Sequence, residues 1–161
     1  MRPKERIAIV LKALNKGDNW ERFLKDHLQE CYSPTHLDLV HKHKQFIRKE
    51  WSQNPDERLF QFLINRNFLP DVHSLFFKEE LGWLIKNKIL KIRDVFFWRT
   101  YGKTGRGKGK NVLIKNMDTD HIENILKDYN AGRQPMTTEV FEYFKNELLY
   151  RKSERILNRT Q

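Results

Sequence analysis

The sequence predicts an α+β fold that is predominantly α-helical, with one β-hairpin at about residues 94–115 and a long C-terminal helix. Three observations support this prediction. Apolar residues recur every three or four positions over most of the chain, which is the spacing of amphipathic helices. Between residues 94 and 115, β-branched and aromatic residues flank a glycine-rich segment, as in a hairpin. After residue 118 the helical spacing returns.

The first two helices have recognisable ends. Residues 4–16 form an amphipathic pattern that stops at Gly17, a residue suited to a helix C-terminus. Asp18 begins the second helix, and Glu21 lies three residues later, which is the spacing of a capping box. The apolar stripe of this helix continues to Cys31, so we expect a buried and unreactive thiol there.

Two further helix starts follow. Ser33-Pro34 opens a helix that extends to Trp51, because serine caps a helix and proline suits its first turn. Residues 54–57, Asn-Pro-Asp-Glu, repeat this signal more strongly and open another helix. Residues 74–77 suit a short strand or the first turn of a helix, and residues 78–87 favour a helix despite Gly82.

The hairpin prediction decides how the segment YGKTGRGKGKN at 101–111 is interpreted. It matches most of a phosphate-binding Walker A loop, but Gly109 stands where that loop needs Ser or Thr. A Walker A loop also leads from a strand into a helix, whereas residues 111–115 have the pattern of a strand. We therefore expect a hairpin tip and no nucleotide hydrolysis.

The C-terminal part returns to helices. Asp120 and Glu123 have capping-box spacing at the start of one helix, and Thr137 or Thr138 caps the last and longest. We expect an N-terminal helical segment of residues 1–53 and an α+β domain of residues 54–161, or a single compact domain of residues 1–161.

Composition indicates an acidic partner. The 161 residues include 31 Lys and Arg against 21 Asp and Glu, a formal charge of +10, which favours nucleic acid or another polyanion. The single cysteine excludes an intramolecular disulfide and fits a reducing cytosol. The N-terminus lacks the features of a signal peptide, and the longest apolar run is too short to span a membrane. We expect a cytoplasmic protein with no membrane partner.

The candidate binding site is the hairpin and its tip. Six basic residues lie between Asp94 and Asp118 with no acidic residue among them, and the glycines let the backbone approach a ligand closely. Tyr101 is three residues from Trp98, so on a strand one ring faces the core while the other is available for base stacking, unless both pack. The predicted nucleic-acid or phosphate-binding residues are Arg99, Tyr101, Lys103, Arg106, Lys108, Lys110 and Lys115.

Other side-chain groups are weaker candidates. The cysteine and nearby histidines lack the spacing of zinc ligands, so no metal or other cofactor is predicted. His121 lies beside two aspartates, but a residue at a helix start more often caps or packs locally. No nucleophile motif or paired catalytic carboxylates are present. We therefore expect a non-enzymatic protein.

Two stretches carry a resemblance to known sequences. Residues 41–65 contain a tryptophan that ends a helix, then Asn-Pro-Asp, Arg-Leu and a glutamine. Residues 96–126 contain a Trp-x-Thr-x-Gly-Lys hairpin followed by a Met-Asp-Thr-x-His-Ile helix start. Both resemble short uncharacterised phage and prophage proteins, over about residues 41–150. The resemblance implies a phage accessory protein in the cytosol of a bacterial host, and it implies no activity.

Three functions follow from these patterns. The first is binding of nucleic acid through the basic hairpin. The second is inhibition by docking on a host or anti-phage defence protein, because four tryptophans offer aromatic anchors. The third is sequestration of a nucleotide signal by the glycine-rich segment.

Overall fold

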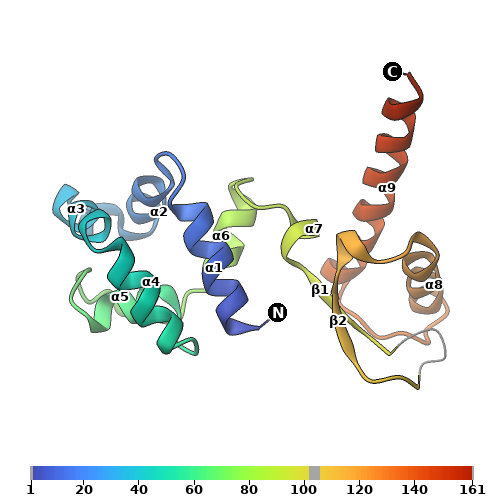
Figure 1. The fold of residues 1–161 in the computed structure, drawn as a ribbon, viewed down its shortest axis with the longest axis horizontal. Helices are drawn as coiled ribbons and strands as arrows, with labels where there is room; N and C mark the ends of the chain where they lie inside the picture. The colour runs from blue at the N-terminus through green and yellow to red at the C-terminus, as the bar shows by residue number, and fades with distance from the viewer. Residues whose placement is uncertain (1, 102–105, 161) are drawn as a thin grey trace. The chain divides into compact units, whose positions relative to one another are not determined.

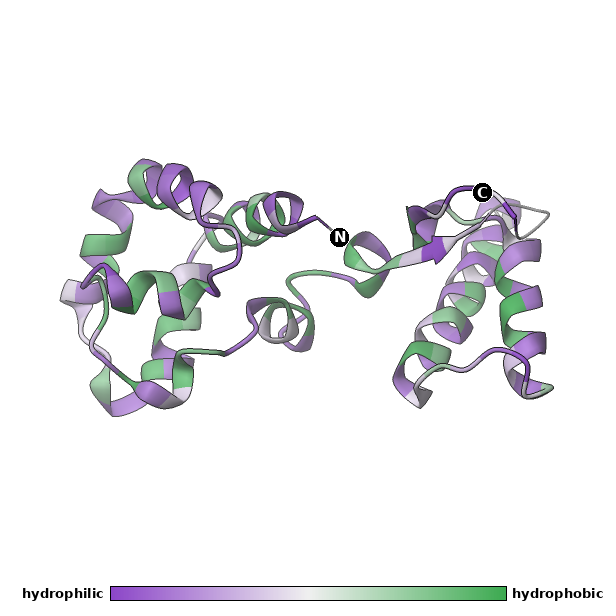
Figure 2. Cartoon of the chain, turned by 90° about the horizontal axis from the view of Figure 1, so that it is seen from below, coloured by the Kyte–Doolittle hydropathy of each residue, from purple (hydrophilic) through white to green (hydrophobic). Residues whose placement is uncertain are grey.

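The computed structural model describes residues 2–101 and 106–160 and confirms the predicted α+β class (Figure 1). Most described residues are helical, one antiparallel hairpin lies between residues 97 and 113, and a long helix ends the chain. The chain divides into two compact units, residues 1–90 and residues 91–161. Hydrophobic and hydrophilic stretches alternate along the helices of both units, as expected for amphipathic segments (Figure 2).

The first unit is all-helical in its described residues. Its elements are α1 (Pro3–Leu14), α2 (Asn19–Leu28), η1 (Gln29–Cys31), α3 (Pro34–Lys42), α4 (Lys44–Gln53), α5 (Leu59–Asn65), η2 (His73–Leu75) and α6 (Glu80–Lys86), where η marks a 3-10 turn. Its core contains Trp20, Phe23, Trp51 and Phe60, each almost completely buried. Phe23 stacks on Phe60 with ring centroids 5.0 Å apart.

The division between the units lies after Leu90, whereas the sequence pattern placed a boundary before Asn54. The physical reason is the apolar side of α5. Phe60 and Leu63 on this helix are fully buried in the same core as Ile7 and Trp20. Burying two such side chains contributes roughly 3–6 kcal/mol, so α5 belongs with the helices that cover it.

Two predicted helix starts differ in the structure. The helix opened by Ser33-Pro34 is confirmed at its start, but it is interrupted at His43, which separates α3 from α4. Residues 54–57 form a turn instead of a first helical turn, and α5 begins only at Leu59. The Trp51 indole donates to the Glu57 carbonyl at 2.8 Å, which holds this turn against α4.

The prediction of a buried thiol at Cys31 was wrong. Cys31 is exposed. Helix α2 ends at Leu28, and Gln29 adopts a φ of 50°, a left-handed conformation that turns the chain. Cys31 therefore does not lie on the buried apolar side of α2, which contains Trp20 and Leu24.

The predicted caps are confirmed in part. Ser33 accepts from the Thr35 amide at 3.3 Å, and Thr137 accepts from the Val140 amide at 3.2 Å, each at the expected helix start. The side chain of Asp18 makes no capping hydrogen bond to α2. The helix expected after Asp120 begins two residues earlier, at Thr119, with Asp118 in place of Asp120 as the flanking residue.

The second unit packs one face of a hairpin against two helices (Figure 1). Its elements are α7 (Ile92–Val95), β1 (Phe97–Thr100), β2 (Lys110–Leu113), η3 (Ile114–Asn116), α8 (Thr119–Asn130) and α9 (Thr138–Thr160). The register pairs Phe97 with Leu113, Trp98 with Val112, Arg99 with Asn111 and Thr100 with Lys110. Phe144 of α9 is fully buried, and Trp98 meets it edge to face at 5.1 Å.

The first unit contains a buried carboxylate. Glu80 is only 1% exposed, and its Oε1 accepts from Arg6 at 2.9 Å. Among the described residues, Glu80 Oε2 is buried without a hydrogen-bond partner. Burial raises the pKa of the Glu80 carboxyl above its ordinary value of 4.5, and the Arg6 charge, which acts in the opposite direction, is the smaller effect.

Glu80→Gln tests this balance through the pH dependence of stability. Because the folded wild-type protein binds the Glu80 proton more tightly than the unfolded chain does, the stabilising contribution of this group is fully present below pH 4.5 and is lost as pH rises through the folded pKa. The variant cannot ionise at this position. Its unfolding free energy, measured with urea at a series of pH values, should therefore improve relative to wild type between pH 4.5 and neutrality. Glu30→Gln, an exposed control, should show a pH-independent difference. If the difference in unfolding free energy between Glu80→Gln and wild type also does not change with pH, the expectation is contradicted.

Candidate nucleic-acid interface

The two faces of the hairpin have different environments. Strand residues alternate in direction, so Trp98 and Val112 point together toward the core of the second unit. Arg99 and Tyr101 point to the opposite face, where both are exposed. The Arg99 guanidinium lies 5.7 Å from the centre of the Tyr101 ring, within the range of a cation–π contact. One ring is therefore packed and the other exposed, as one of the two sequence interpretations required.

Two glycines serve contacts within the hairpin. The Gly107 amide donates to the Tyr101 carbonyl at 2.9 Å, and a Cβ at Gly107 would lie 2.8 Å from that same oxygen. A Cβ at Gly109 would overlap the Arg99 guanidinium, which lies against the backbone there. Since backbone atoms cannot withdraw as a flexible side chain can, a side chain at Gly107 would distort the hairpin. These two glycines allow close approach of the chain to itself.

The structure also bears on the phosphate-loop interpretation. The segment that contains Gly107 leads into β2, which pairs antiparallel with β1. A Walker A loop would instead lead into a helix whose first amides hold phosphate. The hairpin prediction is therefore confirmed.

Most of the predicted binding residues lie on the hairpin and are exposed. Lys103 lies outside the residues that the structure describes. The described and exposed members of the predicted set on this hairpin are Arg99, Tyr101, Arg106, Lys108 and Lys110. The structure thus brings five predicted residues together around one strand pair.

Lys115 differs from the rest of the set. It lies in η3, beyond the end of β2, and its ammonium group is 3.1 Å from the Asp94 carboxylate. The sequence interpretation treated all six basic residues as lacking a counter-charge, and for Lys115 this was wrong. Both partners are partly exposed, so the pair contributes at most about 1 kcal/mol. Lys115 remains accessible, but its charge is partly compensated.

A buried carboxylate holds the base of the hairpin. Glu147 of α9 is 3% exposed and accepts hydrogen bonds from two arginines. Arg93 of α7 donates through Nε at 3.0 Å and through Nη2 at 3.2 Å, and Arg151 donates through Nε at 2.9 Å. The Glu147 hydrogen bonds raise the pKa of the Arg93 guanidinium, so this arginine stays charged.

Arg151 also forms hydrogen bonds with two other segments of the second unit. Its Nη1 donates to the Thr119 hydroxyl at 2.9 Å, and its Nη2 donates to the Ile114 carbonyl at 3.0 Å and to the Lys115 carbonyl at 3.3 Å. One side chain of α9 therefore contacts η3, which directly follows β2, and the start of α8.

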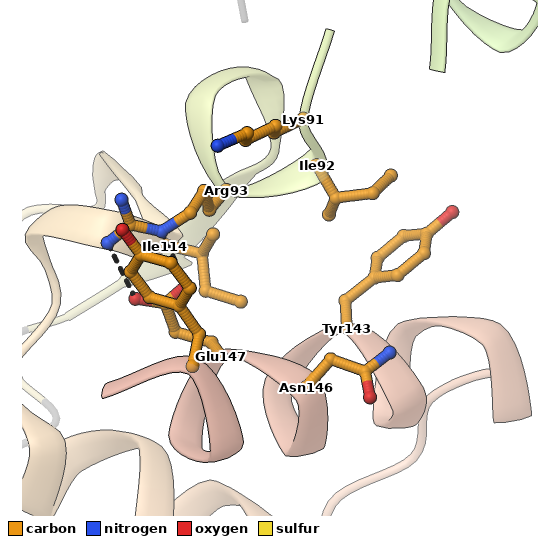
Figure 3. Close-up of a pocket in the computed structure, with 8 residues that line it drawn as sticks. Lys91, Ile92, Arg93, Ile114, Tyr143, Asn146 and Glu147 are labelled. Carbon is orange, nitrogen blue, oxygen red and sulfur yellow. Dashed lines mark hydrogen bonds and ion pairs between the residues drawn. The ribbon is translucent and has the colours of Figure 1, made fainter. Parts of the chain in front are cut away.

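A pocket of about 190 Å³ lies beside this network (Figure 3). Lys91, Ile92 and Arg93 lie on one side of it, and Tyr143, Asn146 and Glu147 of α9 lie on the other. Ile114 contributes apolar surface, and Tyr150 completes the lining. The Arg93 guanidinium lies 4.1 Å from the centre of the Tyr150 ring, so a paired arginine and an aromatic ring close one end of the pocket.

Sequence reasoning missed this pocket. Its residues come from three separated segments, and a helical pattern alone does not show which face meets α7. The available signal was the Lys-Ile-Arg run at 91–93, which extends the basic segment to the N-terminal side of Asp94. That run was not included in the predicted site.

Comparisons with protein-family models, with curated proteins and with solved structures each found no match. Among the described residues, no helix combines the length and the apolar character needed to cross a membrane. Within the same part of the chain, no three His, Cys, Asp or Glu side chains are grouped so that they could hold a metal ion. His27 and His36 instead make local contacts, with the Phe23 carbonyl at 2.8 Å and the Ser33 amide at 3.2 Å.

Glu147→Ala should destabilise the second unit selectively. Removing the shared acceptor leaves Arg93 and Arg151 facing each other, and breaking a buried ion pair from one side costs about 3–5 kcal/mol. Because both arginines are partly exposed, we expect the lower end of this range. Hydrogen exchange of the β1 and β2 amides should accelerate accordingly, while that of α2 should not. Glu142→Ala, an exposed position on the same helix, should change stability by less than about 0.5 kcal/mol. Equal effects of the two variants would contradict the structural role of Glu147.

Proposed function

We propose that this chain is a non-enzymatic protein that binds nucleic acid through the outer face and tip of its β1–β2 hairpin. One observation carries the proposal: Arg99 is exposed on the outer face of the strand pair, Lys108 and Lys110 are exposed at its tip end, and the face that bears Trp98 and Val112 is anchored in the core. A strand pair that is packed on a core and ends in basic residues is suited to a phosphate backbone, because the packed face holds the basic residues close together.

The chemistry of the exposed face supports nucleic acid over other anions. Tyr101 is 49% exposed beside Arg99, so a flat aromatic surface adjoins a guanidinium group. Proteins that bind single strands combine these elements, since phosphates contact the basic groups while bases stack on aromatic rings. An acidic protein surface would satisfy the charges but would leave the Tyr101 ring without a matching planar partner.

The proposal retains the phage or prophage context suggested by the sequence resemblance. A small basic protein of this kind would act as an accessory factor on nucleic acid in a bacterial host. Docking on a host or defence protein and capture of a nucleotide signal stay predictions from the sequence. The experiments below give different results for these alternatives.

Replacing Lys103, Arg106, Lys108 and Lys110 with Ala should weaken binding and reduce its dependence on salt. Each phosphate contact contributes about 0.7–0.9 to the slope of log K against log salt concentration, so four contacts account for up to about 3.6. The measurement is fluorescence anisotropy with a labelled oligonucleotide at several salt concentrations. Of the four residues only Lys110 lies in a strand, at the exposed first position of β2, and the Glu147 network is untouched, so the fold should be retained.

The matched control removes the same charge from the first unit. Lys12, Lys16, Arg48 and Lys49 are exposed there, and their replacement with Ala lowers the net charge equally. If binding depends on the hairpin, only the hairpin variant should bind more weakly and show a smaller slope of log K against log salt concentration. Equal losses in both variants would show that net charge alone causes binding, and unchanged affinity in the hairpin variant would exclude the hairpin as the interface.

A further inference from the structure

We propose that the pocket between α7 and α9 receives one unstacked base of a single-stranded nucleic acid. This inference rests on the proposed function, because it assumes that a strand is held on the adjoining hairpin. It adds a second binding element, formed by residues outside the basic segment that the sequence singled out.

The size of the pocket limits its ligand. Sites for drug-sized molecules enclose about 300–1,000 Å³. A volume of about 190 Å³ is smaller and suits a single planar ring system. Ile92 and Ile114 supply apolar surface, and the Tyr143 ring rises from α9 beside them (Figure 3). A nucleobase bound here would leave water and contact aliphatic and aromatic side chains instead.

Tyr143, in the pocket wall, is uncharged, so its ring is the surface that it offers to a ligand. The Tyr143 hydroxyl donates a hydrogen bond to Glu139, one turn earlier on α9. Burial, together with this bond, raises the pKa of Tyr143 to about 12, so the side chain is neutral at physiological pH. A neutral phenol ring is a stacking surface for any base, because every base has a π-face.

Polar groups at the opening match the remaining parts of a nucleotide. Asn146 is exposed on α9, and its amide offers both a donor and an acceptor, as the edge of a base requires. Lys91 is exposed at the opposite side and supplies an ammonium group for a phosphate. Arg93 serves a different role, because Glu147 occupies its Nε and Nη2 and Tyr150 stacks on its face.

The pocket is continuous with the hairpin along the chain. Strand β2 runs from Lys110 to Leu113, and Ile114 in the pocket wall follows directly. Four residues of extended chain cover about 13 Å. A nucleic-acid strand that contacts Lys110 therefore reaches the pocket within a few nucleotides. A base in a duplex cannot enter without losing its pair, so the pocket should favour single strands.

The test fills the pocket and varies the ligand. Asn146→Trp places a large ring at the opening from an exposed helical position, so folding should be retained. Asn158→Trp is the matched control, since Asn158 is an exposed asparagine on the same helix that does not line the pocket. Anisotropy titrations use a short oligothymidylate, a strand of the same length made of abasic sites, and the corresponding thymidylate–adenylate duplex. Thermal denaturation of each variant verifies folding.

We expect Asn146→Trp to bind oligothymidylate about 5- to 100-fold more weakly than wild type, the range for loss of one stacked base. Its affinity for the abasic strand and for the duplex should be unchanged, and Asn158→Trp should resemble wild type on all three ligands. Lys91→Ala should weaken binding of the normal and abasic strands alike, because it removes a phosphate contact.

The outcomes separate this inference from the proposed function. Wild-type protein that binds none of the three ligands would overturn both. Salt-dependent binding that Asn146→Trp leaves unchanged would overturn the pocket assignment and leave the hairpin interface standing. If thymidine 5′-monophosphate binds to wild type but not to Asn146→Trp, and the affinity for the oligonucleotide is equal in the two proteins, the pocket serves a free nucleotide and the assignment to a strand is wrong.

Discussion

The arrangement of the second unit depends on one buried carboxylate. Glu147 accepts from Arg93 and Arg151. Arg151 in turn donates to two carbonyls of η3, directly after β2, and to the Thr119 hydroxyl at the start of α8. A charge removed from water is costly unless its partners surround it, so this group of bonds tolerates little displacement. Arg93 and Glu147 of this network also line the proposed base pocket, and its Arg151 contacts η3, which follows the proposed hairpin interface.

The hairpin of the second unit has two different faces. A two-stranded hairpin is marginally stable alone, and here the Trp98 and Val112 face is anchored by Phe144 and α8. The opposite face is left with Arg99 and Tyr101, which contact each other and water. Gly107 lets the backbone close on itself at the end of the strands. Rigid packing on one side and exposed charge on the other follow from a single alternation of side chains.

The first unit also contains a buried carboxylate that is paired with an arginine, but here burial and pairing affect the carboxylate differently. Arg6 pairs with Glu80 and also donates to the Pro55 carbonyl at 3.0 Å, so it links α1 to α6 and to the turn before α5. Burial of Glu80 nevertheless outweighs the attraction of Arg6 and raises the pKa of the carboxyl. Glu147 has two arginine partners where Glu80 has one, so each of its oxygens is satisfied. Buried ion pairs in this chain thus hold elements in place more than they add stability.

The sequence by itself determined the class of the fold, the hairpin, the long last helix and the caps at Ser33 and Thr137, because these depend on spacing and turn chemistry within a few residues. It also located the basic hairpin residues. Tertiary structure decided the exposure of Cys31, the inclusion of α5 in the first unit, the pairing of Lys115 with Asp94 and the pocket beside Glu147. Each of these depends on which distant segment covers a given face, and local patterns carry no information about that partner.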